Sequence, residues 1–333
     1  MNSVDVVVVT PFDVGSGRGN SVSARRIGGV AESLGLSVAV MGGGDEIVDG
    51  KVLVALHARR SRVAIERFGK LYPGRKRVVV LTGSDLHIDL PTAGEAAATV
   101  LETMELADVL VLAQAGSVAA VPERFRGKLT VVPKSVDIGL PDFEPPARTG
   151  GLRGVIAAHL RPLKDPFCAV EALGQTGVEV AVRIDHYGAV QDGEMRARAE
   201  WESARNRRYH WHGEVSRARM VAEMGKCHLH LNTALMEGGA NSVCEAIGIG
   251  VPVVATCIPG NVGMLGEGYQ GYFEVGDTLA LAGLLRRCWA DFDFWEGLRR
   301  QVVARSKLFT REQEMAGWKL VLGGDLAFQT MVD

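Results

Sequence analysis

Val4-Asp5-Val6-Val7-Val8-Val9-Thr10 opens the chain as a run of β-branched residues. Pro11 interrupts the run, and a glycine-rich loop follows, Gly15-Ser16-Gly17-Arg18-Gly19-Asn20. A near-continuous apolar run that ends at turn residues is typical of a strand buried in a parallel sheet. Ser21 or Ser23 can cap a helix that runs to about Ser33. The stretch therefore predicts the strand–loop–helix unit that begins a doubly wound α/β sheet.

The same alternation continues on both sides of a proline-rich interruption. In the first half we expect strands at 37–41, 52–56, 78–81, 109–112 and 129–132, and helices at 62–71, 93–106 and 116–124. The interruption contains Pro133, Pro141, Pro145 and Pro146, with Gly150-Gly151 just beyond them. In the second half we expect strands at 155–158, 179–187, 229–232 and 252–255, and helices at 166–173, 193–204, 216–224, 242–249 and 278–289.

This alternation predicts an α/β protein with two Rossmann-like, doubly wound domains that face each other across a cleft. We place the first domain at 1–140 and the second at 150–309. The last residues predict one or two helices, and a helix at about 310–333 is expected to pack back on the first domain. Ligands of such sheets bind at the carboxyl ends of the strands, so the site residues should lie in the loops there.

Composition excludes several classes of partner. The 333 residues carry a net charge of −2, so no general basic surface for nucleic acid is expected. No apolar run reaches 18 residues, and the first residues lack the pattern of a signal peptide; we therefore expect a cytoplasmic protein without a membrane partner. The five cysteines form no Cys-x-x-Cys pair, and His228 and His230 share a strand face without a third ligand. We expect no metal and no cofactor; the oligomeric state does not follow from the sequence.

The first glycine-rich loop does not match the dinucleotide fingerprint. Gly15 and Gly17 fit Gly-x-Gly-x-x-Gly, but Asn20 stands at the third position. The next predicted strand ends in glycines, where the ribose contact would need an acidic residue. The loop is then either an ordinary turn or one that lets an anion approach the backbone.

A second motif separates two glutamates by seven residues, Glu237-Gly238-Gly239-Ala240-Asn241-Ser242-Val243-Cys244-Glu245. The glycines precede a helix that starts near Ser242, so its N-terminal amides can receive an anion. Glu245 falls a turn into the helix while Glu237 stays at the strand end. The two carboxylates would address two parts of one long ligand, on either side of its phosphates.

This motif, together with the following 246–256, resembles the signature of the family 4 retaining glycosyltransferases, which have the GT-B fold. Segments 107–112, 131–137, 213–215 and 275–277 resemble other motifs of that family in the same order. The resemblance implies that Glu245 holds the ribose and Glu237 the donor sugar, and that Lys164 neutralises the diphosphate. The family's arginine five residues before that lysine is His159 here, so either Arg161 replaces it or His159 has another role.

The resemblance implies that the amides of Asn241, Ser242 and Val243 receive the β-phosphate of the donor. The second domain would then bind the nucleotide sugar, and the first would be the acceptor side. The resemblance implies no metal, because two cations and a helix dipole neutralise the phosphates. Arg161, Lys164 and Glu237 are the catalytic candidates. The donor-binding candidates are Gly17, His159, Gly213, Gly239, Ala240, Asn241, Ser242, Val243 and Glu245.

Segments 55–61, 81–92, 159–166, 208–214, 259–263 and 271–277 resemble one subgroup of the family, the selenosugar synthases of selenoneine biosynthesis. That resemblance implies a UDP-sugar donor, UDP-N-acetylglucosamine or UDP-glucose, and selenophosphate as acceptor. Many family members carry a histidine where this chain has Thr82-Gly83-Ser84-Asp85. An acceptor that is already an anion needs positioning and opposite charge, whereas an alcohol must lose a proton.

The acceptor-binding candidates follow two neighbouring strands and the first loop: Arg18, Asn20, Arg25, His57, Arg59, Arg60, Ser84 and Asp85. We expect Arg59 or Arg60 to reach the acceptor phosphate and the other to pair with a carboxylate, for which Asp85 is the candidate. His57 is a core residue, an acceptor contact or a general base. The alternatives are solvated helix-end arginines, a transferase for hydroxyl acceptors, a nucleotide-sugar epimerase or a binding module without turnover.

Overall fold

The computed structural model describes residues 3–136, 144, 146–147 and 150–323. Its backbone divides into two compact units, one formed by Met1–Ser135 with Thr310–Asp333 and one by Val136–Phe309. The first domain was expected to end at 140 and the second to begin at 150, whereas the division falls between Ser135 and Val136; the expected end of the second domain at 309 agrees. Asp137 of the junction motif and the end of the expected 310–333 helix lie outside the described residues.

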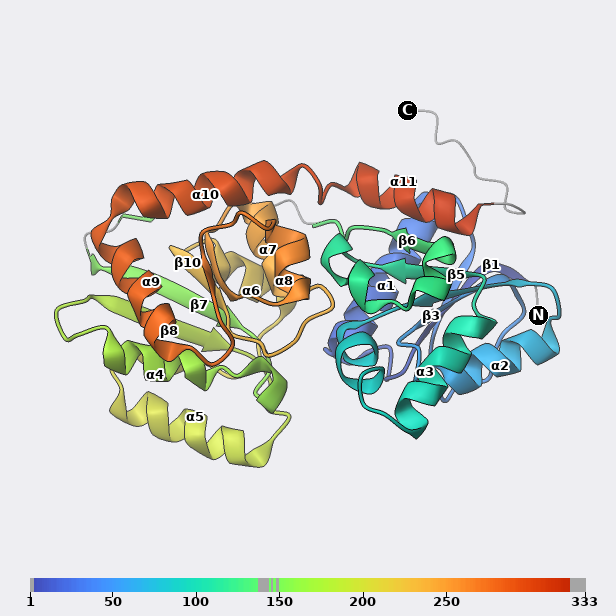
Figure 1. Ribbon diagram of the computed structural model, residues 1–333, viewed down its shortest axis with the longest axis horizontal. Helices are drawn as coiled ribbons and strands as arrows, with labels where there is room; N and C mark the ends of the chain where they lie inside the picture. Colours follow the sequence, from blue (N-terminus) through green and yellow to red (C-terminus); the bar gives the residue numbers. More distant parts are fainter. Residues whose placement is uncertain (1–2, 137–143, 145, 148–149, 324–333) are drawn as a thin grey trace. The chain divides into compact units, whose positions relative to one another are not determined.

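The N-terminal unit is a parallel sheet with strand order β2-β1-β3-β4-β5-β6 (Figure 1). Its strands are β1 (Val4–Thr10), β2 (Val38–Gly42), β3 (Gly50–Leu56), β4 (Lys76–Val80), β5 (Val109–Leu112) and β6 (Leu129–Val131). Its helices are α1 (Gly19–Ser33), α2 (Arg62–Leu71), α3 (Glu95–Leu106) and α11 (Arg311–Leu322). Short helical turns follow β4 and β5, namely η1 (Asp85–Asp89), η2 (Ala115–Ala120) and η3 (Glu123–Lys128).

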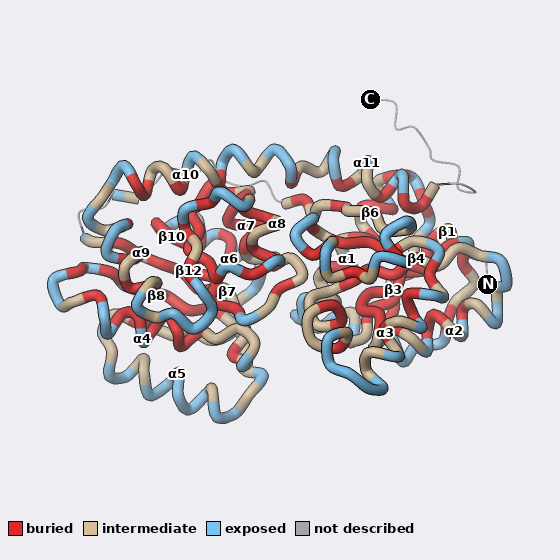
Figure 2. Tube along the Cα trace, viewed as in Figure 1, coloured by how far each residue is buried: buried red, intermediate tan, exposed pale blue. Residues whose placement is uncertain are grey.

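Strand β1 shows why residues 6–9 of the opening run are all valine. Val6 and Val8 pack on the face that α1 and α11 cover, and Val7 and Val9 pack on the face that α2 and α3 cover. All four valines are fully buried, as the red strands of this unit in Figure 2 illustrate. A strand covered on both faces needs no polar alternation, so the continuous valine run specifies a central parallel strand.

Helix α11 completes the N-terminal unit although it lies at the far end of the sequence. Trp318, Val321 and Leu322 belong to the same hydrophobic cluster as Val6 and Val8. The ammonium of Lys76, at the start of β4, donates to the carbonyl of Gly323 at 3.0 Å and also to that of Val321. A cation at a helix C-terminus satisfies carbonyls that lack partners and complements the helix dipole.

The carboxylate of Glu314 holds α11 to the end of the first segment of this unit. It is 1% exposed and accepts hydrogen bonds from the amide of Ser135, at 2.8 Å, and from its hydroxyl. The guanidinium of Arg26 on α1 lies 3.5 Å from its other oxygen. One buried carboxylate therefore joins α1, α11 and the residue where the chain leaves the unit.

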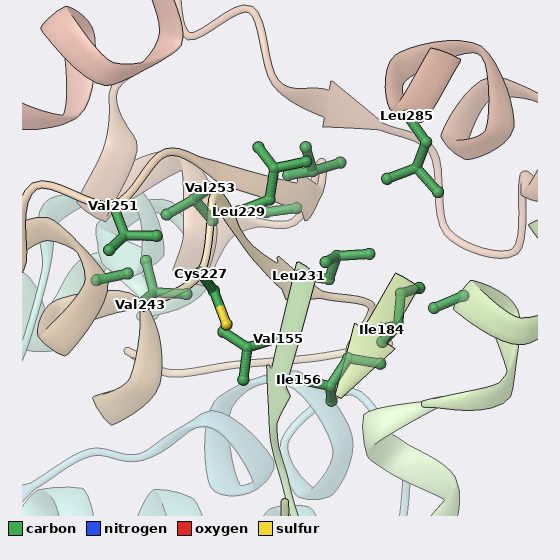
Figure 3. Close-up of a cluster of buried hydrophobic side chains, with 14 of the residues drawn as sticks. Val155, Ile156, Ile184, Cys227, Leu229, Leu231, Val243, Val251, Val253 and Leu285 are labelled. Carbon is green, nitrogen blue, oxygen red and sulfur yellow. The ribbon is translucent and has the colours of Figure 1, made fainter. Parts of the chain in front are cut away.

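The C-terminal unit is a second parallel sheet, with strand order β12-β11-β10-β7-β8-β9. Its strands are β7 (Leu152–Ala157), β8 (Val182–Tyr187), β9 (Tyr209–Trp211), β10 (Leu229–Asn232), β11 (Val253–Thr256) and β12 (Tyr272–Phe273). Its helices are α4 (Phe167–Gln175), α5 (Gly193–Arg205), α6 (Arg217–Met224), α7 (Asn241–Ile249), α8 (Pro259–Leu265), α9 (Thr278–Ala290) and α10 (Phe292–Ser306), with a 3₁₀ turn η5 (Pro162–Lys164). Figure 3 shows part of its core, where Val155, Ile184 and Leu231 come from three different strands.

The structure corrects several local predictions. Helix α1 begins at Gly19 with Arg18 as its N-cap, so neither Ser21 nor Ser23 caps it; the hydroxyl of Ser21 instead donates to the Asp13 carbonyl at 2.8 Å. The helix expected at 116–124 is wrong. Two 3₁₀ turns replace it, because Pro122 cannot occupy the interior of a helix.

Strands β9 and β12 were not expected from the sequence. They have three and two residues, which is too short for a hydrophobic period to be read. No helix in the described part of the chain is long and apolar enough to cross a membrane. Of the five cysteines, Cys257 is exposed and the other four are buried.

We predict that Glu314→Ala lowers the free energy of unfolding of the N-terminal unit by about 2–4 kcal/mol. The substitution leaves the Ser135 amide and hydroxyl and the Arg26 guanidinium without their shared acceptor. Chemical denaturation followed by circular dichroism measures the loss. Glu312→Ala, at an exposed position of the same helix, is the matched control. Equal stability of both variants would contradict the role of Glu314.

Candidate functional site

Two loops at the carboxyl end of the C-terminal sheet bring Lys164 and Glu237 together. Lys164 lies in η5 after β7, and Glu237 follows β10; their side chains form an ion pair and are 17% and 9% exposed. The amide of Leu235 donates to the Leu163 carbonyl at 3.0 Å, and the hydroxyl of Thr233 donates to the Lys164 carbonyl at 3.0 Å. These two hydrogen bonds join the loops and hold the backbone of Lys164 close to the loop that carries Glu237.

Gly260, at the start of α8, lies directly against the backbone of Glu237. A Cβ atom at this position would lie 2.1 Å from the Glu237 carbonyl oxygen. Only a residue without a side chain allows α8 to approach the Glu237 backbone so closely. Gly260 belongs to segment 259–263, which carries the subgroup resemblance, but its contact with Glu237 was not predicted from the sequence.

The N-terminus of α7 is the candidate phosphate site. Gly239 has φ of +151°, and the N-cap residue Ala240 has no side-chain acceptor for the first-turn amides. These amides belong to Asn241, Ser242 and Val243, the three residues predicted to receive a phosphate. A helix N-terminus favours an anion through its N–H groups and its dipole.

Glu245 lies one turn into α7 and is 6% exposed. Its Oε1 pairs with the Nε of Arg217 at 2.6 Å. Arg217 is the first residue of α6, where a cation opposes the helix dipole. Sequence reasoning missed Arg217, although two arginines at a helix start are an unusual pattern that could have drawn attention to it.

His159 and Gly213 join neighbouring loops. The Nδ1 atom of His159 accepts a hydrogen bond from the Ala189 amide at 3.1 Å. Gly213 has φ of +73°, and its carbonyl accepts from the Gly188 amide at 2.8 Å. Arg161 directly precedes η5 in an extended conformation. The donor contacts of these residues stay predictions.

In the N-terminal unit, the guanidinium groups of two predicted acceptor arginines lie over one aromatic ring. The guanidinium carbons of Arg18 and Arg60 lie 4.4 and 5.2 Å from the ring centroid of Phe12. Both are exposed, and within the described residues neither forms an ion pair with a carboxylate. Cation–π contacts orient the guanidinium groups without neutralising them. Phe12 was not predicted as a site residue from the sequence.

The other arginines near these loops are occupied. The guanidinium of Arg25 donates to the carbonyls of Val14 and Ser16, the latter at 3.4 Å, so Arg25 shapes the first loop. Gly17 and Asn20 flank the start of α1. Arg59 pairs with Asp89 at 3.2 Å, and the predicted partner Asp85 was therefore wrong.

Asp85 is not open to an acceptor. It is fully buried and accepts from the amides of Ala58 at 2.8 Å and Thr82 at 2.7 Å, and from the Thr82 hydroxyl. Burial raises the pKa of Asp85 to about 7, although these donors act in the opposite direction. Asp85 ties the loop after β3 to the loop after β4, so its assignment as an acceptor contact is corrected to a structural one.

His57 and Ser84 are held together by these loops, with Nε2 of His57 3.0 Å from the Ser84 hydroxyl. His228 and His230 use ring nitrogens to bind backbone atoms of Arg153, Pro146 and Val155. Across the residues that the structure describes, no group of three or more histidine, cysteine or acidic side chains could hold a metal ion.

Comparison with known proteins places this geometry in a fold class. Residues 162–291, which contain Lys164, Glu237 and Glu245, match the family model described as "Glycosyl transferases group 1". No curated protein matches the chain. The family match and the fold together support a glycosyltransferase.

Several solved structures share the fold at low sequence identity. Alr3699/HepE of Anabaena in complex with UDP is 15% identical with a TM-score of 0.76, over 96% of this chain and 99% of that one. Sucrose-phosphate synthase of Thermosynechococcus elongatus is 14% identical with a TM-score of 0.75, over 95% and 98%. The pneumococcal O-GlcNAc transferase GtfA in complex with UDP and GlcNAc is 16% identical with a TM-score of 0.65, over 81% and 56%. The chain has the GT-B fold.

We predict that Gly260→Ala abolishes most glycosyl transfer, because the added methyl group would displace Glu237 from beside Lys164. Gly268→Ala is the matched control, since a Cβ atom there meets nothing within 4 Å. Rates of UDP release by the two variants decide the point. Wild-type rates for Gly260→Ala would show that Glu237 needs no support from α8.

Proposed function

We propose that this protein is a glycosyltransferase that joins the selenium of selenophosphate to the anomeric carbon of a UDP-sugar and releases UDP. The selenium–carbon bond forms as the bond from the anomeric carbon to the diphosphate oxygen breaks. Water then cleaves the selenium–phosphorus bond, which leaves a 1-selenosugar and phosphate. UDP-N-acetylglucosamine or UDP-glucose is the donor.

The observation that carries the donor half is the N-terminus of α7 between Glu237 and Glu245. The helix amides suit the diphosphate, Glu245 suits ribose hydroxyls, and Glu237 beside Lys164 suits the sugar. HepE and GtfA, which share the fold, have been solved with UDP. Those complexes support a uridine diphosphate donor here.

Lys164 has the position of a group that stabilises the leaving diphosphate. Negative charge on that oxygen grows as the bond to the sugar breaks, so a fixed cation contributes most in the transition state. Lys164 is paired with Glu237 in the structure. A donor diphosphate would then share the lysine with the glutamate that contacts its sugar.

The acceptor half rests on Arg18 and Arg60 around Phe12. Two guanidinium groups that no carboxylate of the described residues neutralises suit a phosphate-like anion. Selenophosphate combines such an anion with a soft nucleophilic atom. A hydroxyl acceptor would not need this charge. Transfer to a hydroxyl group would appear as UDP release that depends on an alcohol.

The direct test is the rate of UDP release with each UDP-sugar in the presence of selenophosphate, sugar alcohols or no acceptor. We expect release that depends on selenophosphate. Release that depends on an alcohol would identify a transferase for hydroxyl acceptors, and equal release without any acceptor would contradict transfer.

We predict that Glu245→Ala weakens UDP binding about tenfold or more. A hydrogen bond between a hydroxyl and a charged carboxylate contributes about 1.5–3 kcal/mol. Isothermal titration with UDP measures the change, with Glu267→Ala, an exposed glutamate of the same unit, as control. Unchanged affinity in Glu245→Ala would remove the ribose assignment.

Arg18→Ala and Arg60→Ala should each raise the KM for selenophosphate about tenfold, which corresponds to about 1.4 kcal/mol, while UDP affinity stays the same. Steady-state kinetics with saturating UDP-sugar provide the measurement. Arg67→Ala on α2 is the matched control, since Arg67 is exposed and forms a surface ion pair with Glu46 at 3.8 Å. Wild-type acceptor KM values in both variants would move the anion site elsewhere.

A further inference from the structure

We propose that His57 is a neutral positioning residue, not a general base, and that it aims the Ser84 hydroxyl at an anionic acceptor. The N-terminal unit would then offer such an acceptor a fixed hydrogen-bond donor. This inference rests on the proposed function and adds to it the role of His57.

The backbone of His57 is held in a strained conformation. Its φ is +74°, and Asp165 is the other non-glycine residue with positive φ among those described. Its amide donates to the Val80 carbonyl at 2.9 Å, and its carbonyl accepts from the Ser61 amide at 3.0 Å. A strained backbone conformation of this kind persists where the surrounding structure holds it in place, and such residues cluster at functional sites. Here it turns the ring from the end of β3 toward the loop after β4.

The contacts of the ring define which nitrogen carries the hydrogen. Nδ1 faces the backbone amide of Arg60 at 3.5 Å, an N–H donor, so Nδ1 is the acceptor. The hydrogen of the neutral ring therefore lies on Nε2, which donates to the Ser84 hydroxyl oxygen at 3.0 Å. That bond occupies a lone pair of Ser84 and leaves its own hydrogen to donate outward. Ser84 is partly exposed, whereas His57 is buried.

The surrounding charges keep the ring neutral. Burial, followed by the charges of Arg60 and Arg59, lowers the pKa of His57 to about 3. Two carboxylates lie near, but Asp85 is 3.8 Å from Nδ1 and Asp89 is 3.9 Å from Nε2. Both distances exceed a hydrogen bond. Asp85 is held by Ala58 and Thr82, and the other oxygen of Asp89 pairs with Arg59.

The consequence is a site that donates hydrogen bonds. His57 donates its N–H to Ser84, Ser84 presents its own O–H, and the arginines present charge. The Ser84 hydroxyl and the arginines can therefore stabilise an oxyanion. A protonated hydroxyl acceptor would need a base within reach. His57 does not supply one, because its Nδ1 accepts from the Arg60 amide and its Nε2 donates to Ser84. Asp89 Oδ2, which lies 3.9 Å from Nε2, is buried and has no hydrogen-bond partner within the described residues. The selectivity for an anion then follows from the direction of one hydrogen bond as well as from charge.

The first test is nitrogen-15 NMR of the ring of His57 in the full chain from pH 5.5 to 8, assigned by its loss in His57→Asn. We expect Nδ1 without a hydrogen and Nε2 with one throughout. A ring protonated on both nitrogens, or on Nδ1 alone, would overturn the proposal. This measurement needs no turnover, so it stands apart from a failure of selenophosphate as a substrate.

The second test compares kcat/KM for selenophosphate across variants. His57→Asn keeps a donor and suits positive φ, so its rate should fall less than tenfold, and its pH profile should match that of the wild type. His57→Leu should fall at least a hundredfold, and Ser84→Ala should raise the acceptor KM with normal UDP affinity. An acid limb present in the wild type and absent in His57→Asn would identify His57 as a base. A wild-type acceptor KM in Ser84→Ala would likewise overturn the proposal.

Discussion

Parallel pairing of the strands is the constraint on which the rest of the structure depends. In each sheet it sends every strand's carboxyl end to the same edge, so loops distant in sequence become neighbours there. Lys164 and Glu237 meet because β7 and β10 are adjacent strands, and His57 and Ser84 meet because β3 and β4 are. Close contacts that only glycine permits, such as Gly260 against Glu237, then fix these loops more tightly than the strands alone could.

The two units differ in how the charged side chains of their candidate sites are paired. In the C-terminal unit, each glutamate of the motif has a cation beside it, Lys164 for Glu237 and Arg217 for Glu245. Buried carboxylates need such partners, because an unpaired buried charge is costly. In the N-terminal unit, Arg18 and Arg60 stack on an aromatic ring and remain charged. The first arrangement suits a ligand that exchanges contacts with existing pairs, and the second suits an anion that supplies the missing charge.

The sequence predicted the α/β class and most of the alternating strands and helices, because long valine-rich strands and amphipathic helices carry strong periodic signals. It also identified the loops that hold the candidate residues. It could not predict partners that come from elsewhere in the chain. Arg217 beside Glu245, Phe12 between two arginines and the burial of Asp85 depend on side-chain packing, which spacing along the chain does not encode. The pairing of Arg59 with Asp89 instead of Asp85 depends on a π-helical turn at 85–89, a rare geometry without a sequence signature.

The central claim is that a UDP-sugar and a selenium-bearing anion react here to form a carbon–selenium bond. Mass spectrometry of the product formed from UDP-N-acetylglucosamine or UDP-glucose with selenophosphate tests it most directly. We expect a sugar that carries one selenium atom on its anomeric carbon, with UDP formed in equal amount. A selenium-free product, or a free sugar with UDP, would contradict the claim.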